Sequence, residues 1–367
     1  MARGIVDLGT LEGVRATDQL RTLEGFRTSG RRVLLFTAPR RIEIREEPLA
    51  APPPGHALVV TQVSALSAGT ELLAFRGELP PDLPIDETLG AHGGATFRYP
   101  FRYGYASVGT VAAIGDGVAL AWLGRRVFAF EPHASAFVAP VTDLAPVPEG
   151  LPPERAVLYP HMETAVNLIL DGAPAYDDAV LVVGQGVIGL LVTALLARFP
   201  LSVLAAAERA PGRAAMARRM GAHAVLDEGR AEAWAALAGA RGADLVYELS
   251  GDPSALDLAI AVAGHEARIV VGSWYGAKRA PIDLGGRFHR RRLRIVSSQV
   301  SHIGAALSAR WDRARRREAT WRALADIDTA PLVSHRVPFA DAARAYALAD
   351  AGDPGALQIL LIGEPVT

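Results

Sequence analysis

Short hydrophobic runs broken by proline and glycine fill residues 32–146. Apolar and polar residues alternate in several of these runs, which is the period of a strand with one buried face. Pro39 separates the first two runs, so they predict a hairpin. Many short strands with this punctuation favour a partly closed β-barrel. The predicted strands are Arg32–Thr37, Arg41–Glu46, Ala57–Ser64, Tyr105–Ile114 and Arg126–Phe130.

Hydrophobic runs then alternate with helical stretches, which predicts a parallel, doubly wound α/β sheet. A helical stretch, Pro152–Gly172, precedes these units, and Pro160 should kink or divide it. The sixth strand follows a basic loop instead of an obvious helix. The six predicted strands are Ala179–Val183, Ser202–Glu208, Ala224–Asp227, Ala243–Leu249, Ala267–Trp274 and Leu293–Gln299.

The last part of the chain predicts two helices, Arg310–Asp326 and Phe339–Asp350, and a final strand, Gln358–Ile362. We expect this part to return to the β-rich domain and make it discontinuous. In the first helix, spacings of three and four predict one face formed by Trp311, Ala314, Glu318, Trp321 and Ala325. The opposite face is predicted to be solvated or to bind an anion, and it carries Arg313, Arg315, Arg316 and Arg317.

The chain thus divides into an extension (1–31), a β-rich domain (32–155), an α/β domain (156–302) and a return to the β-rich domain (303–367). In the extension, Leu8, Leu11, Leu20 and Leu23 would fit a short helix, although a poorly ordered segment fits as well.

Composition narrows the possible functions. The chain has 367 residues, half of them hydrophobic, which suits two domains with separate cores. The net charge is −1, so nothing indicates a nucleic-acid partner. The absence of cysteine excludes disulfides, a thiol nucleophile and a cysteine-ligated zinc. No signal-peptide pattern opens the chain, so a cytoplasmic protein without a membrane partner is expected.

Residues 179–208 carry the most informative pattern. A short apolar strand enters a turn with Gly184, Gly186 and Gly189, and a helix leaves it. This is the dinucleotide-binding fingerprint in its required context, and the glycines allow the tight turn, the approach of the pyrophosphate and close helix packing. The helix start at Val187 and Ile188 would present free N–H groups to the phosphates.

Glu208 follows the last glycine at the distance where a carboxylate binds the adenosine ribose, and it would repel a 2′-phosphate. We therefore expect NAD. Arg209 and Arg213 follow at once and would neutralise such a phosphate, so NADP stays possible. A basic cluster is predicted either to meet the cofactor phosphates or an acidic substrate, or to be a solvated loop: Arg287, His289, Arg290, Arg291, Arg292 and Arg294.

The sequence from about Arg32 to its end resembles the medium-chain dehydrogenase/reductase superfamily. The resemblance rests on the glycine turn and on Ser67–Glu71, Tyr103–Val111, Asp244–Gly251, Arg268–Gly272 and Val333–Ala342. It implies a GroES-like β-barrel beside a Rossmann sheet, a small-molecule substrate and a homodimer. It also implies cofactor contacts from Ser250, Gly272 and Ser298, the last at the polar end of the sixth strand.

The chain departs from zinc-dependent members of that superfamily. Ala68 and Tyr105 occupy the positions of their cysteine and histidine ligands, so we expect no zinc. A substitute site built from His161, Glu163 or His92 is the alternative. Ser67–Glu71, with Phe75–Pro80 close behind, looks like the zinc-lacking branch near bacteriochlorophyllide hydroxyethyl dehydrogenases, which oxidise a secondary alcohol.

Without a metal, the protein must handle the proton itself. Thr70 matches the family position whose hydroxyl contacts the reacting oxygen. Tyr105 would place a phenol nearby as an acid or hydrogen-bond donor, and the ordinary pKa of His161 would suit a proton shuttle. A packed aromatic and a structural histidine are the alternatives. The leading hypothesis is a zinc-independent NAD(P) oxidoreductase for a secondary alcohol or ketone; a quinone or enoyl reductase and a non-catalytic nucleotide-binding protein are the others.

Overall fold

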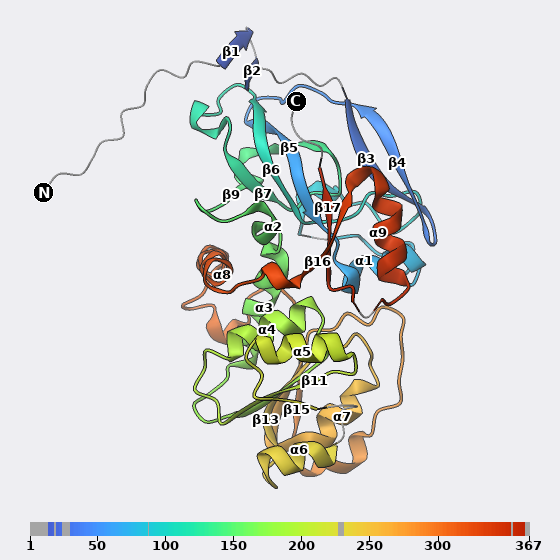
Figure 1. Ribbon diagram of the computed structural model, residues 1–367, viewed down its shortest axis with the longest axis vertical. Coiled ribbons are helices and arrows are strands. Elements are labelled where there is room, and N and C mark those ends of the chain that lie inside the picture. Colours follow the sequence, from blue (N-terminus) through green and yellow to red (C-terminus); the bar gives the residue numbers. More distant parts are fainter. Residues whose placement is uncertain are drawn as a thin grey trace, which may run out of the picture.

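The computed structural model describes residues 14–17, 20–23, 30–86, 88–226, 231–353 and 355–363. Figure 1 shows a β-rich lobe above an α/β lobe, with α2, α3 and α8 where the two meet. Leu8 and Leu11 of the predicted helix lie outside the described residues. Leu20–Leu23 is strand β2, which pairs antiparallel with β6, so the helix prediction is wrong there.

The β-rich domain is built on one sheet with the strand order β1-β2-β6-β5-β17-β16 in the described part of the chain. Strands β7, β8 and β9 attach to its centre through β6 and β5. The predicted hairpin is present as the separate antiparallel pair β3–β4. The elements are β1 (Val14–Thr17), β2, β3 (Gly30–Ala38), β4 (Arg41–Pro48), β5 (His56–Ala65), α1 (Ala68–Arg76), β6 (Ser107–Ile114), β7 (Arg126–Ala129), β8 (Ala136–Pro140) and β9 (Ala145–Pro146).

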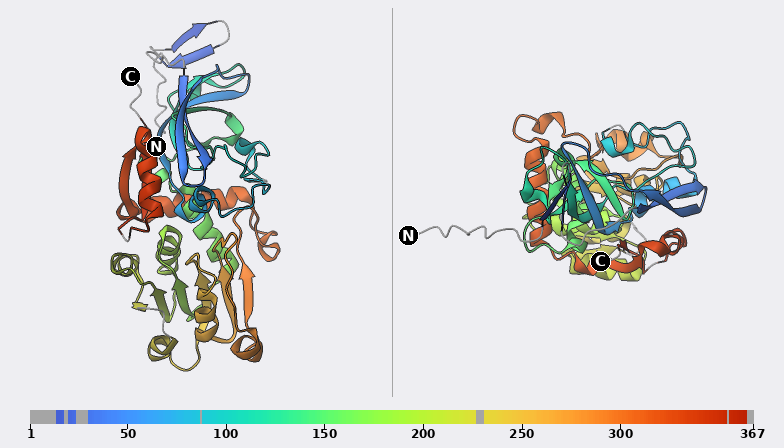
Figure 2. Two further views of the ribbon diagram at one scale, coloured as in Figure 1. Left: turned by 90° about the vertical axis from the view of Figure 1, so that its right-hand side faces the viewer. Right: turned by 90° about the horizontal axis from the view of Figure 1, so that it is seen from above.

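The C-terminal part returns to this domain, as the sequence predicts. Strand β17 (Gln358–Ile362) pairs antiparallel with β5 and parallel with β16 (Val333–Pro338). Helix α9 (Ala342–Asp350) packs beside α1. Figures 1 and 2 show these red elements against the blue strands of the N-terminal half. The β-rich domain is therefore discontinuous in sequence.

The α/β domain has a parallel sheet in the order β12-β11-β10-β13-β14-β15 among the described residues. The predicted fold class, a doubly wound Rossmann sheet beside a discontinuous GroES-like barrel domain, is confirmed. The order reverses at β10, and ligands of such sheets bind at this reversal, beyond the carboxyl ends of the strands. The elements are β10 (Ala179–Val183), α4 (Val187–Leu196), β11 (Val203–Ala207), α5 (Pro211–Arg219), β12 (Ala224–Leu226), α6 (Ala231–Ala238), β13 (Ala243–Glu248), α7 (Ala255–Val262), β14 (Ala263–Val271) and β15 (Arg294–Ser297).

The predicted linking helix is divided in two, α2 (Pro153–Ala156) and α3 (Tyr159–Gly172). Pro160 lies in the first turn of α3, where its missing N–H breaks no helical hydrogen bond. Helix α3 contributes Leu168 and Met162 to the core that joins the two domains. The kink prediction is confirmed, and the division places the start of α3 at the base of the interdomain cleft.

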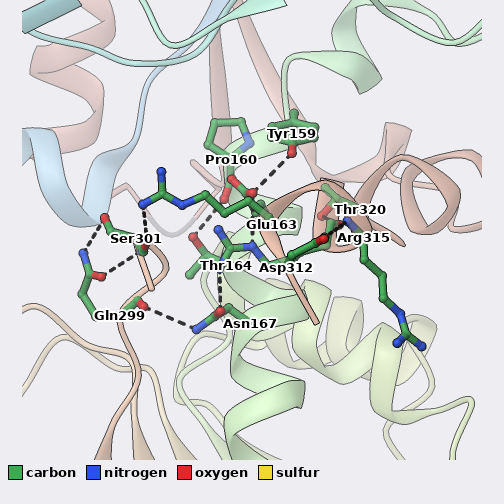
Figure 3. A network of polar contacts seen from close by, with 12 residues as sticks. Tyr159, Pro160, Glu163, Thr164, Asn167, Gln299, Ser301, Asp312, Arg315 and Thr320 are labelled. Atoms are coloured by element: carbon green, nitrogen blue, oxygen red, sulfur yellow. Dashed lines mark hydrogen bonds and ion pairs between the residues drawn. The ribbon is translucent and has the colours of Figure 1, made fainter. Parts of the chain in front are cut away.

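Helix α8 (Arg313–Asp326) contradicts the predicted amphipathic pattern. Its buried residues are Arg316, Thr320, Ala323 and Leu324, whereas Ala314, Glu318 and Ala325 of the predicted apolar face are exposed. The prediction failed because the contact with α3 is polar: Arg316 is only 3% exposed and forms an ion pair with Glu163. Figure 3 shows this network of polar contacts, which continues to Asn167 and Gln299.

Candidate active site

A cleft of about 660 Å³ lies between the two domains. Its floor is the carboxyl edge of the parallel sheet, including the turn between β10 and α4 and the ends of β11, β13 and β14. Its opposite side comes from α1, from Tyr105 before β6 and from the loop between α9 and β17. The discontinuous chain path is what brings this last loop over the α/β domain.

The glycine turn has the geometry that a dinucleotide requires. Gly184 has φ +87°, and a Cβ there would lie 2.6 Å from Cα of Ser250. A Cβ on Gly189 would lie 2.0 Å from the carbonyl oxygen of Gly184, so only glycine lets α4 start this close to the strand. A Cβ on Gly186 would meet no atom within 4 Å, because this residue faces the open cleft. Val187 and Ile188 begin α4 and line the cleft.

Glu208 is fixed at the end of β11 by two backbone donors. Its carboxylate accepts from the N–H of Gln185 at 2.9 Å and from the N–H of Ala210 at 2.9 Å. The side chain of Gln185, which the sequence analysis did not single out, is fully buried and accepts from Thr193 Oγ1 at 3.1 Å. The glycine turn and the acid at the end of β11 are therefore held in one hydrogen-bonded unit.

The two arginines after Glu208 have different environments. Arg209 is exposed at the cleft. Arg213, on α5, donates from its guanidinium to the carbonyl oxygen of Ala356 at 3.0 Å. That bond joins the α/β domain to the loop before β17, which closes one end of the cleft.

Ser250 and Gly272 follow β13 and β14 and both line the cleft. Glu248, a fully buried acid, organises this edge: it accepts from the N–H of Ser250 at 2.8 Å and from the hydroxyl of Tyr275 at 2.5 Å. The sequence showed Glu248 only as part of an apolar strand. A Cβ on Gly272 would lie 2.6 Å from Leu249 Cδ2, so the leucine side chains pack closely over this glycine.

Thr70, Tyr105 and His161 come together in the same cleft, although they lie far apart in sequence. The hydroxyl of Tyr105 donates to Ser67 Oγ. Burial raises the pKa of Tyr105 to about 12, even though hydrogen bonds with Ser67 and Thr70 act to lower it. Tyr105 is therefore a neutral phenol near pH 7, which suits a hydrogen-bond donor or acid and not a base.

The shuttle prediction for His161 needs correction. Burial lowers the pKa of His161 to about 4, and the charge of Glu71 offsets this only in part. The imidazole is 5% exposed, and its Nδ1 has no hydrogen-bond partner among the described residues. His161 is therefore neutral near pH 7 and able to hydrogen-bond a ligand in the cleft, but it is not poised to exchange protons there.

Glu71, the neighbour of Thr70, is fully buried and has a structural role. It accepts from the N–H of Ser67 at 2.8 Å, from His133 Nε2 at 3.0 Å and from the hydroxyl of Tyr346. Burial alone would raise the pKa of Glu71, but His133 and the other hydrogen bonds lower it overall. His133, missed in the sequence because nothing marks it there, thus helps to hold the start of α1.

Other predicted site residues lie outside the cleft. Ser298 donates to Asp171 Oδ2 of α3 at 2.7 Å and is not among the described residues that line the cleft. Gln299 and Ser301, which continue the polar end of the predicted sixth strand, bond to each other. The basic cluster precedes β15, so it lies at the amino ends of the strands, where Arg292 pairs with Glu266 at 2.8 Å. The prediction that this cluster meets the cofactor phosphates is wrong, because phosphates bind at the opposite edge.

The donor set does not fit a catalytic zinc. Ala68 offers no ligand atom, and the phenol of Tyr105 is hydrogen-bonded to Ser67. The predicted substitute residues are separated, since Glu163 accepts from Arg316 and His92 borders a different pocket. Within the described ranges, no three His, Cys, Asp or Glu residues are grouped closely enough to hold a metal ion. The same part of the chain contains no helix long and apolar enough to cross a membrane.

The sequence of this chain is similar to those of known dehydrogenases. Residues 187–317 match the zinc-binding dehydrogenase family. The chain is 26% identical to D-guloside 3-dehydrogenase of Escherichia coli K12 over 336 residues, covering 85% of this chain and 94% of that protein. It is 27% identical to 2-desacetyl-2-hydroxyethyl bacteriochlorophyllide A dehydrogenase of Cereibacter sphaeroides over 351 residues, covering 89% and 96%.

Among solved structures, the fold is similar to that of an alcohol dehydrogenase from E. coli CFT073, determined in complex with NADH. The TM-score is 0.74 at 21% sequence identity, over 91% of this chain and all of the other. This likeness concerns the fold, and it covers both domains and the cleft between them.

Proposed function

Because this chain belongs to the medium-chain dehydrogenase/reductase superfamily and is an NAD(P)-dependent dehydrogenase of that type, we propose that it transfers a hydride between NAD and a secondary alcohol or its ketone without a catalytic zinc. The observation that carries the proposal is the meeting of Thr70, Tyr105 and His161 opposite the glycine turn, in one cleft. A nucleotide-binding role alone would need no such group of polar side chains at that place.

The residues present fit a dinucleotide. Gly184–Gly189 and the start of α4 would hold the pyrophosphate, Glu208 the adenosine ribose, and Ser250 and Gly272 the nicotinamide end. The bound cofactor would supply the hydride acceptor or donor. Glu208 supports NAD over NADP, because its carboxylate would repel a 2′-phosphate. Arg213 offers little compensation while it donates to Ala356.

Thr70 and Tyr105 would stabilise the charge that develops on the substrate oxygen. Tyr105 is a neutral donor, so in the ketone-to-alcohol direction it can protonate the forming alkoxide. Neutral His161, which lines the cleft, would accept or donate one further hydrogen bond through its imidazole ring. Glu71, held by His133 and Tyr346, keeps the start of α1, and with it Thr70, in place.

Zinc independence is supported by residue identity, since an alanine and a hydrogen-bonded tyrosine occupy the two ligand positions. To test it, we would treat the purified protein with EDTA, measure its metal content and assay NAD reduction with secondary alcohols. Full activity after chelation, with less than one zinc per ten chains, is expected. Loss of activity that returns only with added zinc would reject this part of the proposal.

The cofactor assignment has a direct test. Titration with NADH and with NADPH, followed by energy transfer from tryptophan to the nicotinamide, should show tighter binding of NADH. Tighter binding of NADPH would instead support the alternative, a quinone or enoyl reductase, and would direct the assays to activated alkenes. Binding of neither would reject the cofactor site.

Tyr105→Phe tests the role of the phenol. Turnover should fall by about 10²–10⁴-fold, the range of a lost general acid, with little change in NADH affinity. Tyr103→Phe is the matched control, because Tyr103 is a buried neighbour whose ring lies 6.2 Å from that of Tyr105 but does not line the cleft. Equal turnover of Tyr105→Phe and the control would remove Tyr105 from the mechanism.

We also propose that the protein is a homodimer. Strand β15 is an edge strand of the six-stranded sheet in the described part of the chain, and its Ile295 is 38% exposed. An exposed edge of this kind can pair with a second copy. Light scattering coupled to gel filtration should give twice the chain mass, and a monomer would reject the proposal.

A further inference from the structure

Among the described residues, the charged side chains that line the cleft belong to the half formed after β11, after β13 and before β17. Among the described lining residues they are Glu208, Arg209, Arg213, Asp252 and Asp353. Glu208 and the arginines follow β11, and the charge of Arg209 acts on Asp252. Asp353 begins the turn whose Ala356 carbonyl accepts from Arg213. This half of the cleft is therefore matched to the charged and hydroxylated part of a dinucleotide.

The other half contains hydroxyl, imidazole and apolar groups. Ser67, Thr70 and Tyr105 are uncharged, and the lowered pKa keeps His161 neutral near pH 7. A substrate carboxylate or phosphate placed here would lose its hydration without gaining an opposite charge, which costs several kcal/mol. The chemistry of this half therefore selects an uncharged reacting group.

An exposed tryptophan, Trp274, borders this neutral half. The structure describes all five tryptophans, and Trp274 is the most exposed of them, at 41%. It lines the cleft directly after the end of β14. Its ring centroid lies 6.4 Å from that of Phe97, Phe97 lies 5.3 Å from Tyr103, and Tyr103 lies 6.2 Å from Tyr105. Phe97 and Tyr103 are buried and do not line the cleft, so they connect the indole to the phenol behind the cleft surface.

The backbone holds Trp274 against the β-rich domain. Gly276, two residues later, has φ +60°, and a Cβ there would lie 3.4 Å from the carbonyl oxygen of Glu78 and from the side chain of Leu73. Leu73 is one helical turn from Thr70 on α1. The turn that follows Trp274 therefore lies beside the helix that carries Thr70, and the indole itself is 41% exposed in the cleft.

We propose that Trp274 is a substrate-binding residue, and that the substrate is an uncharged secondary alcohol whose ring packs on the indole while its hydroxyl reaches Thr70 and Tyr105. The inference rests on the proposed function and narrows its substrate class. The shared chemistry is a neutral ring bearing or adjoining a secondary hydroxyl. A sugar ring and an aromatic ring both provide it, since either can pack on the face of an indole.

The experiment compares matched alcohols with NAD and the full-length protein. For the aromatic arm, 1-phenylethanol is compared with 2-butanol and with the para-carboxylate of 1-phenylethanol. For the sugar arm, a methyl hexoside is compared with a hexose phosphate. In at least one arm, kcat/KM for the neutral ring compound should exceed that of its charged partner by about 100-fold, the consequence of an unpaired charge in a neutral site.

Trp274→Ala should lower the ratio of kcat/KM for the ring compound to that for 2-butanol by about tenfold, and Trp274→Phe should restore most of it. Tyr176→Ala is the control, because it also removes an aromatic ring, 83% exposed, but outside the cleft. A ratio that Trp274→Ala leaves unchanged, or a preference for the charged partner, overturns the proposal.

Failure of the proposed function gives a different result, which is no change in NADH with any alcohol or ketone. In that case, calorimetric binding of the same compounds to the protein–NADH complex still tests Trp274. Weaker binding of the neutral ring compound to Trp274→Ala than to Trp274→Phe supports the inference. Equal binding to both variants, or equal binding of neutral and charged compounds, rejects it.

Discussion

Removal of Arg316 should destabilise the protein far more than removal of a neighbouring arginine. Its guanidinium donates to Glu163 Oε1 at 3.2 Å and to Asn167 Oδ1 at 2.8 Å, and the side chains of the ion pair are 4% and 11% exposed. Each hydrogen bond to a charged group contributes about 1.5–3 kcal/mol. Arg316→Met removes both hydrogen bonds and leaves the Glu163 carboxylate buried without its counter-charge. We therefore expect this substitution to lower the free energy of unfolding by about 3–5 kcal/mol.

Urea unfolding of the cofactor-free protein, with the thermal midpoint as a second readout, measures this change. A loss of about 3 kcal/mol should lower the midpoint by roughly 6–12 °C for a domain of this size. Arg322→Met is the control, because Arg322 is exposed on the same helix, and it should change stability by no more than about 0.5 kcal/mol.

A double-mutant cycle separates the ion pair from the loss of packing. Because Glu163→Gln removes the charge that Arg316→Met strands, the double variant should be less destabilised than the sum of the singles, by roughly 2 kcal/mol. Additive single effects would show that the two side chains are not coupled. Equal stabilities of Arg316→Met and Arg322→Met would refute the reasoning that a buried ion pair joins α8 to α3.

Three further outcomes are expected. Gly189→Ala should abolish NADH binding in the fluorescence titration, because the added Cβ would lie 2.0 Å from the carbonyl oxygen of Gly184; retained affinity would show that the turn can relax. Glu208→Ala should weaken NADH binding by about tenfold, and NADPH binding less, because a charge-assisted bond to the ribose is lost; equal losses would refute the ribose assignment. Burial raises the pKa of Glu131 to about 7. The protonated carboxyl is therefore favoured in the folded protein. Its contribution to stability is fully present below the unfolded-state pKa near 4.5 and disappears as the pH rises through 7. Glu131→Gln should therefore gain stability relative to the parent at pH 8 but not at pH 4.5, and an equal effect at both would contradict the shifted pKa.

The sequence predicted the parts of the fold that depend on local pattern. The six parallel strands, the β3–β4 hairpin and the division before Pro160 follow from hydrophobic period and proline chemistry, which act over a few residues. The glycine turn was readable for the same reason, since Gly184 and Gly189 meet steric demands of the turn itself. The final strand was also predicted, because its run Gln358–Ile362 is apolar and bounded by turn residues.

Contacts between distant elements were not readable. Arg316 has the local pattern of a solvated arginine, and only its meeting with Glu163 across two helices makes its burial favourable. The carboxylate of Glu248 and the imidazole of His133 are likewise fixed by partners far along the chain or after a turn. The pKa of His161 depends on burial, which a sequence pattern does not report for a single residue.

The hydrogen bond from Arg213 to Ala356 links cofactor choice to the mechanical joining of the domains. If this guanidinium turned away from the carbonyl toward a 2′-phosphate, it would release the loop before β17 from the α/β domain. Engineering of NADP preference through Arg213 would therefore loosen the closed end of the cleft, whereas recruitment of the exposed Arg209 would leave it in place. A successful redesign would supply a second donor to the Ala356 carbonyl, so that NADP binding and the contact between the domains no longer depend on the same arginine side chain.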